Sequence, residues 1–329
     1  MKKISAAIVG CGRVSKFHVS AYQNLPTAQL IAGVDIDAKR REWFENTFHL
    51  PAYNSLRDLL VKNPPDLISL CTPSDLHFSQ AKEIIKAGVN LIIEKPVCLS
   101  ESEGNELLKL EGKSQPIIST CFQNRFNPAV KKLLKFVGSK ELGKILIGNV
   151  CVRWFRKPNY YIDHWHGSKR RSGGGVLMTQ AIHHIDLLRI LMGTPDEIKG
   201  YSSCQRPYSE VEDIVVACMK YPSAIASIEC STVAYPKDIE ASISIVAKNG
   251  AIKVGGKSLN KIEYGFIGKK ILVGAADSED VTSVYGTSHI LLIKDVVDAI
   301  TEKRSPLITL SEGVKSLNMV NRIYQNLNK

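Results

Sequence analysis

Short apolar runs alternate with helical patterns along the first part of the chain. Stretches with helical periodicity separate apolar runs at residues 4–9, 30–34, 66–70, 90–95 and 117–121. Apolar runs of this length, bounded by turn residues, are typical of strands in the middle of a sheet. Their alternation with helices predicts an α/β fold with a doubly wound parallel sheet over residues 1–121. Ser100 and Glu103 also form a capping box, which predicts that a helix begins there.

The pattern changes after residue 122. Helices are predicted over residues 128–137 and 176–192, the second after three consecutive glycines, and a strand is predicted over 145–156. Strand patterns with turn signals fill residues 198–273, which predicts an antiparallel sheet with one covered face and one free face. Residues 122–329 are therefore expected to form an α+β domain with a large, open, mostly antiparallel sheet, closed by helices over 288–301 and 311–326.

A glycine-rich turn follows the first strand. Gly10-Cys11-Gly12-Arg13-Val14-Ser15 matches G-x-G-x-x-G with serine in the third small position. The first glycine permits a tight turn, and the second lets the backbone approach a pyrophosphate at a helix N-terminus. Asp35 ends the next strand, where an acid binds the ribose hydroxyls of adenosine. These features predict a Rossmann domain that binds NAD, and the cations at residues 39–41 leave NADP open.

The strand over residues 90–95 ends on Glu94-Lys95-Pro96. Ligands of open α/β sheets bind outside the carboxyl ends of the strands, so Lys95 is placed to take part in chemistry. Pro96 restricts the backbone of Lys95 and presents its ammonium from a stiff corner. The alternative is a strand that simply ends with solvated charges.

The helix over residues 176–192 carries two adjacent histidines with different expected roles. On a helical wheel, His184 falls on the apolar side, which predicts a packed histidine with one satisfied nitrogen. Thr179, His183 and Asp186 gather on the other side, which predicts a general base at His183 with Asp186 as its orienting partner. A solvated pair on an ordinary surface helix is the competing interpretation.

Composition and charge narrow the class of protein. The chain has 329 residues and a formal net charge of +11, but its lysines and arginines are dispersed and no nucleic-acid module is present. An anionic small molecule is a better expected partner than nucleic acid or a membrane. The eight cysteines contain no C-x-x-C pair and are expected to be reduced, and with no leader or membrane span expected, a cytoplasmic location follows. No metal site is predicted, because His164, His166, His183 and His184 lack zinc-ligand spacing.

Together these motifs resemble the glucose–fructose oxidoreductase, inositol dehydrogenase and rhizopine-catabolism (GFO/IDH/MocA) family. Further matching segments are Thr72-Pro73 with His77, Arg125-Phe126-Asn127-Pro128 and Glu212-Asp213. The resemblance implies an NAD(P)-dependent dehydrogenase that acts on CH-OH groups, with Lys95 and His183 as catalytic residues. It also implies a homodimer or homotetramer formed through the C-terminal sheet. The implied cofactor-binding residues are Gly10, Gly12, Arg13, Val14, Asp35, Thr72, Pro73, His77, Glu94, Lys95 and Gln123.

The segment from Val152 to His183 looks most like the dehydrogenases of nucleotide-activated amino sugars. This likeness implies oxidation at C3 of a sugar such as UDP-N-acetylglucosaminuronic acid, in the synthesis of surface polysaccharide. Thr179 occupies a position where many members of the family have an aspartate, which fits this branch. A dehydrogenase of a free sugar or inositol, or a non-catalytic NAD-binding sensor, are the alternatives. The expected substrate residues are Arg125, Arg153, Tyr161, Trp165, Thr179 and Gln180, within a basic segment that also holds Arg156, Lys157, Lys169, Arg170 and Arg171.

Overall fold

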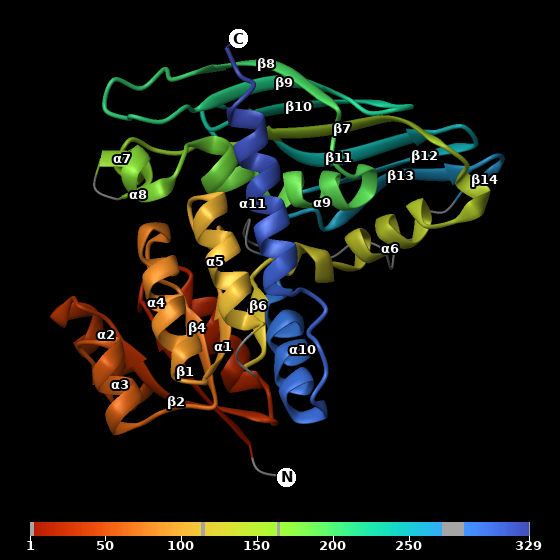
Figure 1. The fold of residues 1–329 in the computed structure, drawn as a ribbon. Helices are drawn as coiled ribbons and strands as arrows, with labels where there is room; N and C mark the ends of the chain where they lie inside the picture. The colour runs from red at the N-terminus through yellow and green to blue at the C-terminus, as the bar shows by residue number, and fades with distance from the viewer. Residues whose placement is uncertain (1–2, 113–115, 163–164, 272–285, 329) are drawn as a thin grey trace. The chain divides into compact units, whose positions relative to one another are not determined.

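A computed structural model describes the chain except for residues 1–2, 113–115, 163–164, 272–285 and 329 (Figure 1). Its contacts divide the chain into two compact units, which we describe separately. The first contains Met1–Gln123 and His289–Leu317, and the second contains Asn124–Ser288 and Asn318–Lys329. The boundary that the sequence predicts at residue 121 lies close to the first division. The sequence predicts His289–Leu317 in the second domain, whereas its contacts place it in the first unit. An amphipathic helix near the chain end does not reveal from its own sequence which sheet it covers.

The first unit contains a six-stranded parallel sheet with the order β3-β2-β1-β4-β5-β6. This confirms the predicted doubly wound sheet, and the chain reverses direction across the sheet between β1 and β4, which are neighbours. Leu91 and Ile92 of β5 are fully buried, as expected for a central strand. The strands are β1 (Ile4–Val9), β2 (Ala28–Val34), β3 (Ala52–Tyr53), β4 (Leu67–Leu70), β5 (Asn90–Ile93) and β6 (Ile118–Thr120).

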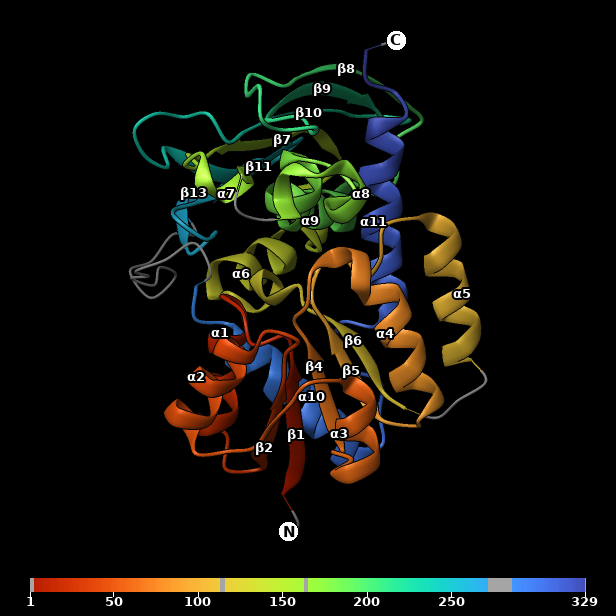
Figure 2. The ribbon, with the colours of Figure 1, turned by 90° about the vertical axis from the view of Figure 1, so that its left-hand side faces the viewer.

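Helices cover both faces of this sheet (Figure 2). One face carries α1, with α10 packed against it, and the other carries α4 and α5 side by side (Figure 2). Ser100 caps α5 through the predicted capping box with Glu103. The helices are α1 (Ser15–Asn24), α2 (Ala38–Phe48), α3 (Leu56–Lys62), α4 (Ser74–Lys86), α5 (Glu101–Glu111) and α10 (His289–Glu302); α11 (Leu310–Tyr324) contributes residues to both units.

The second unit contains an eight-stranded sheet with the order β14-β13-β12-β11-β7-β10-β9-β8 (Figure 1). Its strand pairs are antiparallel except for β7 with β10, so the prediction of a large, mostly antiparallel sheet is confirmed. The strands are β7 (Ile145–Arg153), β8 (Glu197–Ser203), β9 (Ile214–Lys220), β10 (Ile225–Ser231), β11 (Glu240–Ala247), β12 (Gly250–Gly255), β13 (Lys261–Ile267) and β14 (Lys270–Ile271).

The two faces of this sheet differ in what covers them. A Cβ added at Gly148 of β7 would meet the side chains of Leu188 and Met192, so α9 packs on this face. Ile147 and Val216 belong to the other face, where they are 45% and 48% exposed. The helices of the unit are α6 (Pro128–Val137), α7 (Asn159–Ile162), α8 (Lys169–Ser172) and α9 (Ile182–Met192), with 3-10 turns at η1 (Gln123–Phe126, of which Gln123 counts with the first unit), η2 (Lys140–Leu142) and η3 (Trp165–Gly167).

No helix among the described residues is long and apolar enough to cross a membrane.

Candidate functional site

The glycine-rich turn after β1 is shaped for a close backbone approach. Gly10 has φ of +94°, and a Cβ there would lie 2.7 Å from the carbonyl carbon of Cys71, so only glycine fits. A Cβ at Gly12 would have no atom within 4 Å, which leaves open space over the turn. The hydroxyl of Ser15 donates to the carbonyl of Gly12 at 2.7 Å and ties the turn to α1. Arg13 and Val14 lead directly into this helix, so the turn fits a pyrophosphate held at a helix N-terminus.

The carboxylate of Asp35 is held in a fixed orientation at the end of β2. Its Oδ2 accepts the N–H of Cys11 and its Oδ1 accepts the N–H of Asp37, both at 2.9 Å. Arg40 lies beside it, with NH1 3.6 Å from Oδ2. Asp35 is only 7% exposed, so its free lone pairs are directed to a small region beside the glycine turn. This arrangement suits the hydroxyls of an adenosine ribose.

His77 braces the loops that follow β4 and β5. Its Nδ1 lies 2.7 Å from the carbonyl oxygen of Pro96, and its Nε2 lies 2.9 Å from that of Thr72. Burial lowers the pKa of His77, although both carbonyls and nearby carboxylates act in the opposite direction. The ring is 1% exposed, so its contribution to a nucleotide site is to fix the backbone of Thr72, Pro73 and Pro96.

Glu94 follows β5 as a buried, ionised carboxylate. His18 Nε2 lies 3.0 Å from Glu94 Oε1, and the N–H of Lys95 donates to Oε2 at 3.2 Å. Burial by itself raises the pKa of Glu94, but the hydrogen bond from His18 and the positive charge nearby, including that of Lys95, hold the pKa well below its usual range. Lys95 is half-buried at the carboxyl end of the strand, and Gln123 is buried after β6.

A cluster of metal-ligand types surrounds this carboxylate. The potential ligand atoms of His18, Glu94, Cys121 and His289 lie within 4.8 Å of one another. The cluster is different from the four histidines considered in the sequence. Both ring nitrogens of His18 are engaged, one by Ser69 and one by Glu94, so hydrogen bonds within the protein account for the arrangement.

In the second unit, Glu212 fixes the start of the helix that carries His183. Its Oε2 accepts the N–H of Gly175 at 2.8 Å, and its Oε1 accepts the hydroxyl of Tyr324 at 2.7 Å. Burial raises the pKa of Glu212, against the hydrogen bonds from Tyr324 and Gly175 that lower it. A Cβ on Gly175 would lie 1.8 Å from the carbonyl oxygen of Glu212, so the third glycine of the triplet is a packing requirement.

The helix expected over residues 176–192 begins as a π-helical turn, η4 (Leu177–Ala181), and continues as α9. A π turn shifts the angular positions predicted by a regular wheel, and such turns are frequent at functional sites. Thr179 lies within this turn, and its hydroxyl donates to the carbonyl of Gly175 at 2.7 Å. Thr179, His183 and Asp186 are all buried, so the alternative of a solvated surface pair is wrong.

The two histidines and Asp186 have distinct surroundings. Asp186 accepts two hydrogen bonds from Arg125, at 2.8 and 2.5 Å, which places the expected substrate residue Arg125 in a buried ion pair. His183 is 8% exposed. His184 packs edge-on against Trp154, and burial lowers its pKa to about 4. Neither ring nitrogen of His184 has a hydrogen-bond partner in the described part of the chain, so the expectation of one satisfied nitrogen is wrong.

Arg156 and Tyr160 are joined through Gln180 in η4. Arg156 Nε donates to Gln180 Oε1 at 2.9 Å, and Gln180 Nε2 donates to the hydroxyl of Tyr160 at 2.5 Å. The ring of Tyr160 stacks on His166, which stacks on Trp165, with centroid distances of 4.1 and 4.0 Å. An arginine, a glutamine and stacked aromatic rings, all of which suit a sugar or an anion, thus lie against the π-helical turn that leads to His183.

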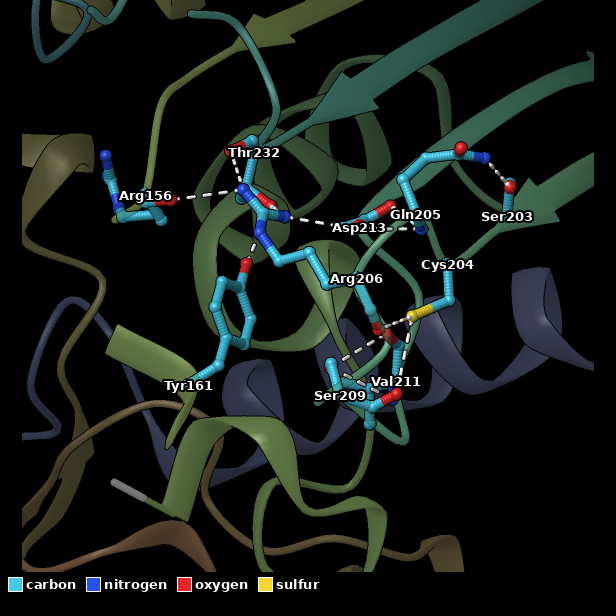
Figure 3. A network of polar contacts seen from close by, with 10 residues as sticks. All are labelled: Arg156, Tyr161, Ser203, Cys204, Gln205, Arg206, Ser209, Val211, Asp213 and Thr232. Atoms are coloured by element: carbon cyan, nitrogen blue, oxygen red, sulfur yellow. Dashed lines mark hydrogen bonds and ion pairs between the residues drawn. The ribbon is translucent and has the colours of Figure 1, made fainter. Parts of the chain in front are cut away.

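A buried arginine that sequence analysis missed organises the other side of this segment (Figure 3). Arg206 pairs with Asp213 at 3.0 Å and donates to the backbone carbonyls of Thr232 and Arg156. Its guanidinium also lies 4.8 Å from the ring centroid of Tyr161, whose hydroxyl is 2.6 Å from Thr232 Oγ1. The expected substrate residue Tyr161 is 4% exposed and serves this network. The available signal was Asp213, an acid directly before the alternating strand pattern of β9.

Arg153 is not brought together with the other expected substrate residues. It follows Val152, which is fully buried on the α9 side, and therefore belongs to the opposite face of the sheet. There its guanidinium pairs with Glu229 at 2.6 Å and with Glu240 at 3.2 Å. Of the basic segment, Arg156 lies near η4, Lys169 and Arg170 are exposed on α8, and His164 lies outside the described residues.

The parallel sheet, the glycine turn and the oriented Asp35 define an oxidoreductase with an NAD-binding Rossmann domain. Residues 4–122 match the GFO/IDH/MocA oxidoreductase family with its NAD-binding Rossmann fold, and residues 130–253 match the GFO/IDH/MocA C-terminal domain. The chain belongs to the GFO/IDH/MocA oxidoreductase family, and NAD is its cofactor.

Similar proteins extend over almost the whole chain. The uncharacterised oxidoreductase YrbE of Bacillus subtilis is 28% identical over 303 residues, which cover 89% of this chain and 80% of that protein. The WlbA dehydrogenase of Bordetella pertussis, in complex with NADH and UDP-GlcNAcA, is 29% identical with a TM-score of 0.89 over 99% of this chain and 96% of that one. The WlbA dehydrogenase of Chromobacterium violaceum, also in complex with NADH and UDP-GlcNAcA, is 30% identical with a TM-score of 0.90 over 99% and 94%.

The close contact at Gly175 gives a test of how the His183 helix is placed. Gly175→Ala forces the start of η4 away from Glu212, since the new Cβ would overlap its carbonyl oxygen. We expect the free energy of unfolding to fall by about 1–3 kcal/mol, measured by chemical denaturation. Gly138→Ala is the matched control in the same unit, because its Cβ would lie 3.4 Å from the nearest atom. Equal stability of the two variants would contradict the packing requirement.

Proposed function

We propose that this NAD-dependent, sugar-type dehydrogenase oxidises the C3 hydroxyl of a nucleotide-activated amino sugar such as UDP-N-acetylglucosaminuronic acid. Such a reaction belongs to the synthesis of modified surface polysaccharide sugars. The likeness to two WlbA dehydrogenases bound to NADH and UDP-GlcNAcA, at TM-scores of 0.89 and 0.90, is the observation that carries this proposal. The two WlbA dehydrogenases are 29% and 30% identical to this chain, whereas levoglucosan dehydrogenase is 23% identical.

The polar residues around η4 support a substrate with anionic groups. Arg156 is held by Gln180 and Asp238, and 15% of its side chain is exposed. Planar guanidinium groups bind carboxylates and phosphates through paired hydrogen bonds. The exposed Lys169 and Arg170 of α8 add positive charge within the same segment of chain. We assign Arg156, Gln180 and Trp165 to sugar or carboxylate contacts, and α8 to the diphosphate.

The chemistry requires that the hydroxyl oxygen lose its proton and that the carbon bearing this hydroxyl lose a hydride. When bound, NAD accepts the hydride at C4 of its nicotinamide. We assign His183 as the base that takes the hydroxyl proton, because a neutral imidazole accepts a proton readily near neutral pH. The Lys95 ammonium stabilises the negative charge that develops on the same oxygen. Glu94 is assigned to the hydroxyls of the nicotinamide ribose and Gln123 to the neighbourhood of the ring.

Oligomer formation through the free face of the second sheet completes the proposal. This face combines exposed apolar side chains, among them Ile147, Val216 and Ile225, with the paired charges around Arg153. Apolar side chains in such numbers on one sheet are typical of a surface that another subunit covers. We therefore propose a homodimer or homotetramer in which copies of this face meet.

The substrate assignment predicts a specific product. With NAD, UDP-N-acetylglucosaminuronic acid should give NADH and a 3-keto sugar, detected by absorbance and mass spectrometry. Arg156→Gln should raise KM by roughly tenfold, as expected when a charged contact worth about 1.4 kcal/mol is lost. Arg153→Gln is the matched control, because this arginine lies three positions away on the opposite face of the sheet. Oxidation of myo-inositol or a free sugar without any reaction of UDP-sugars would overturn the assignment.

The catalytic assignment is tested by two substitutions. Lys95→Ala and His183→Ala should each lower kcat by roughly 10²-fold or more, because each removes a group that acts on the reacting oxygen. Binding of NADH, followed by fluorescence, should persist in both. Lys86→Ala, at an exposed lysine in the last turn of α4, is the control for loss of positive charge. Turnover near that of the wild type in either variant would remove that residue from the mechanism.

The oligomer is tested by mass. Light scattering after size exclusion should give a multiple of the 36.3 kDa chain, and Val216→Arg should lower the mass by placing a charge on the free face. Val61→Arg, at a valine that is 74% exposed on α3, should leave the mass unchanged. A wild-type protein that runs as a monomer would contradict the proposal.

A further inference from the structure

Four buried polar side chains form a continuous line beneath the carboxyl edge of the first sheet. Tyr22 and His18 come from α1, Ser69 from β4, and Glu94 from the end of β5. The hydroxyl of Tyr22 lies 2.7 Å from Ser69 Oγ, which lies 3.0 Å from His18 Nδ1, and His18 Nε2 lies 3.0 Å from Glu94 Oε1. Tyr22, Ser69 and His18 are at most 2% exposed, so water has no access to these three groups.

The chemistry of these groups fixes the direction of the last hydrogen bond. An ionised carboxylate only accepts hydrogen bonds, so His18 Nε2 carries the proton and donates it to Glu94. Ser69 and Tyr22 contain hydroxyls that both donate and accept, so they satisfy Nδ1 in either protonation state of the ring. The line therefore holds the Nε2–H on Glu94 without requiring a charge on His18.

The two thiols and the second histidine beside Glu94 carry no charge that could replace the contact with His18. Burial raises the pKa of the Cys71 and Cys121 thiols well above the usual range, so both stay protonated. Burial lowers the pKa of His289 to about 3, so its ring, which lies edge-on to His18 at 5.6 Å, stays neutral. His77 is engaged by two backbone carbonyls. Lys95 bonds to Glu94 through its backbone N–H, and its charge also lowers the pKa of Glu94, both with and without His18.

We propose that His18 is a positioning residue that holds Glu94 ionised and turned toward the backbone of Lys95, and that it thereby sets the preference of the site for oxidised over reduced cofactor. An anion at the carboxyl end of a central strand lies where sheets of this class bind their ligands. The nicotinamide ring is a cation in NAD⁺ and neutral in NADH, so a fixed negative charge nearby favours NAD⁺. This inference rests on the proposed function, because it acts through the roles assigned there to Glu94 and Lys95.

Loss of His18 should make the binding of NAD⁺ depend on pH. In the wild type the pKa of Glu94 lies well below its usual range, so the carboxylate is ionised throughout the neutral region. Without the donor, burial raises this pKa, and Glu94 takes up a proton as the pH falls. At a pH about one unit below its pKa, a carboxyl group is roughly nine-tenths protonated. The affinity for a bound cation should therefore change by roughly tenfold over about two pH units around this pKa.

The experiment compares affinities for NAD⁺ and NADH by titration at about pH 6 and about pH 8. His18→Leu should bind NAD⁺ roughly tenfold more weakly at the lower pH than at the higher one, with NADH affected much less. His18→Gln should restore most of the wild-type behaviour, because its amide N–H reaches the position of Nε2. In a Glu94→Gln background, His18→Leu should produce no further pH dependence.

The controls separate positioning from a structural role. Tyr22→Phe keeps the packed ring and removes only the far hydroxyl, so it should leave the NAD⁺ to NADH ratio near the wild-type value. A lower melting temperature for His18→Leu with pH-independent NAD⁺ binding would overturn the proposal, as would a pH effect that persists with Glu94→Gln. Binding needs no sugar, so a protein that fails to oxidise UDP-sugars but shows this pH dependence separates failure of the proposed substrate from failure of this inference.

Discussion

The hydrogen bond between His18 and Glu94 is the contact on which the chemistry proposed for the first unit depends. It joins α1 to the end of β5, the fifth strand of the parallel sheet, across 76 positions of sequence. A carboxylate as buried as Glu94 is costly unless a partner stabilises its charge. His18, on α1, is that partner, and the remaining lone pairs of Glu94 are left for groups at the end of β5. The glycine turn, Asp35 and the loop braced by His77 then surround the same carboxyl edge.

The second unit uses a buried glutamate for a different purpose. Glu212 binds the backbone N–H groups of Gly175 and Leu177 at the start of the helical segment, so its carboxylate acts as a cap supplied from a distant loop. Tyr324 near the end of the chain completes its hydrogen bonds. His183 thus depends for its position on residues that are far from it in sequence and that have no direct part in the assigned chemistry.

The sequence predicted elements whose signals are local. The Pro128–Val137 helix, the capping box at Ser100 and the doubly wound parallel sheet follow from periodicity, caps and turns, and the structure confirms them. Where the structure differs from the expectation, register or distant partners decide the outcome. Arg153 and Arg156 look equivalent in sequence. Strand alternation places Arg153 on the free face of the sheet, whereas Arg156 lies after the end of β7. His18 gave no distinct signal, because the acid that it binds lies in another element.

The chain crosses between its two units three times, at Gln123, at Ser288 and at Leu317. Neither unit is therefore a continuous stretch of sequence that a gene fusion could transfer on its own. A fragment that ends at residue 121 retains all six strands of the parallel sheet but lacks α10, and with it the apolar surface that packs on α1 and the ring of His289 beside His18. The cofactor unit therefore becomes complete only after the strands of the second sheet have been synthesised, because α10 follows them in the sequence.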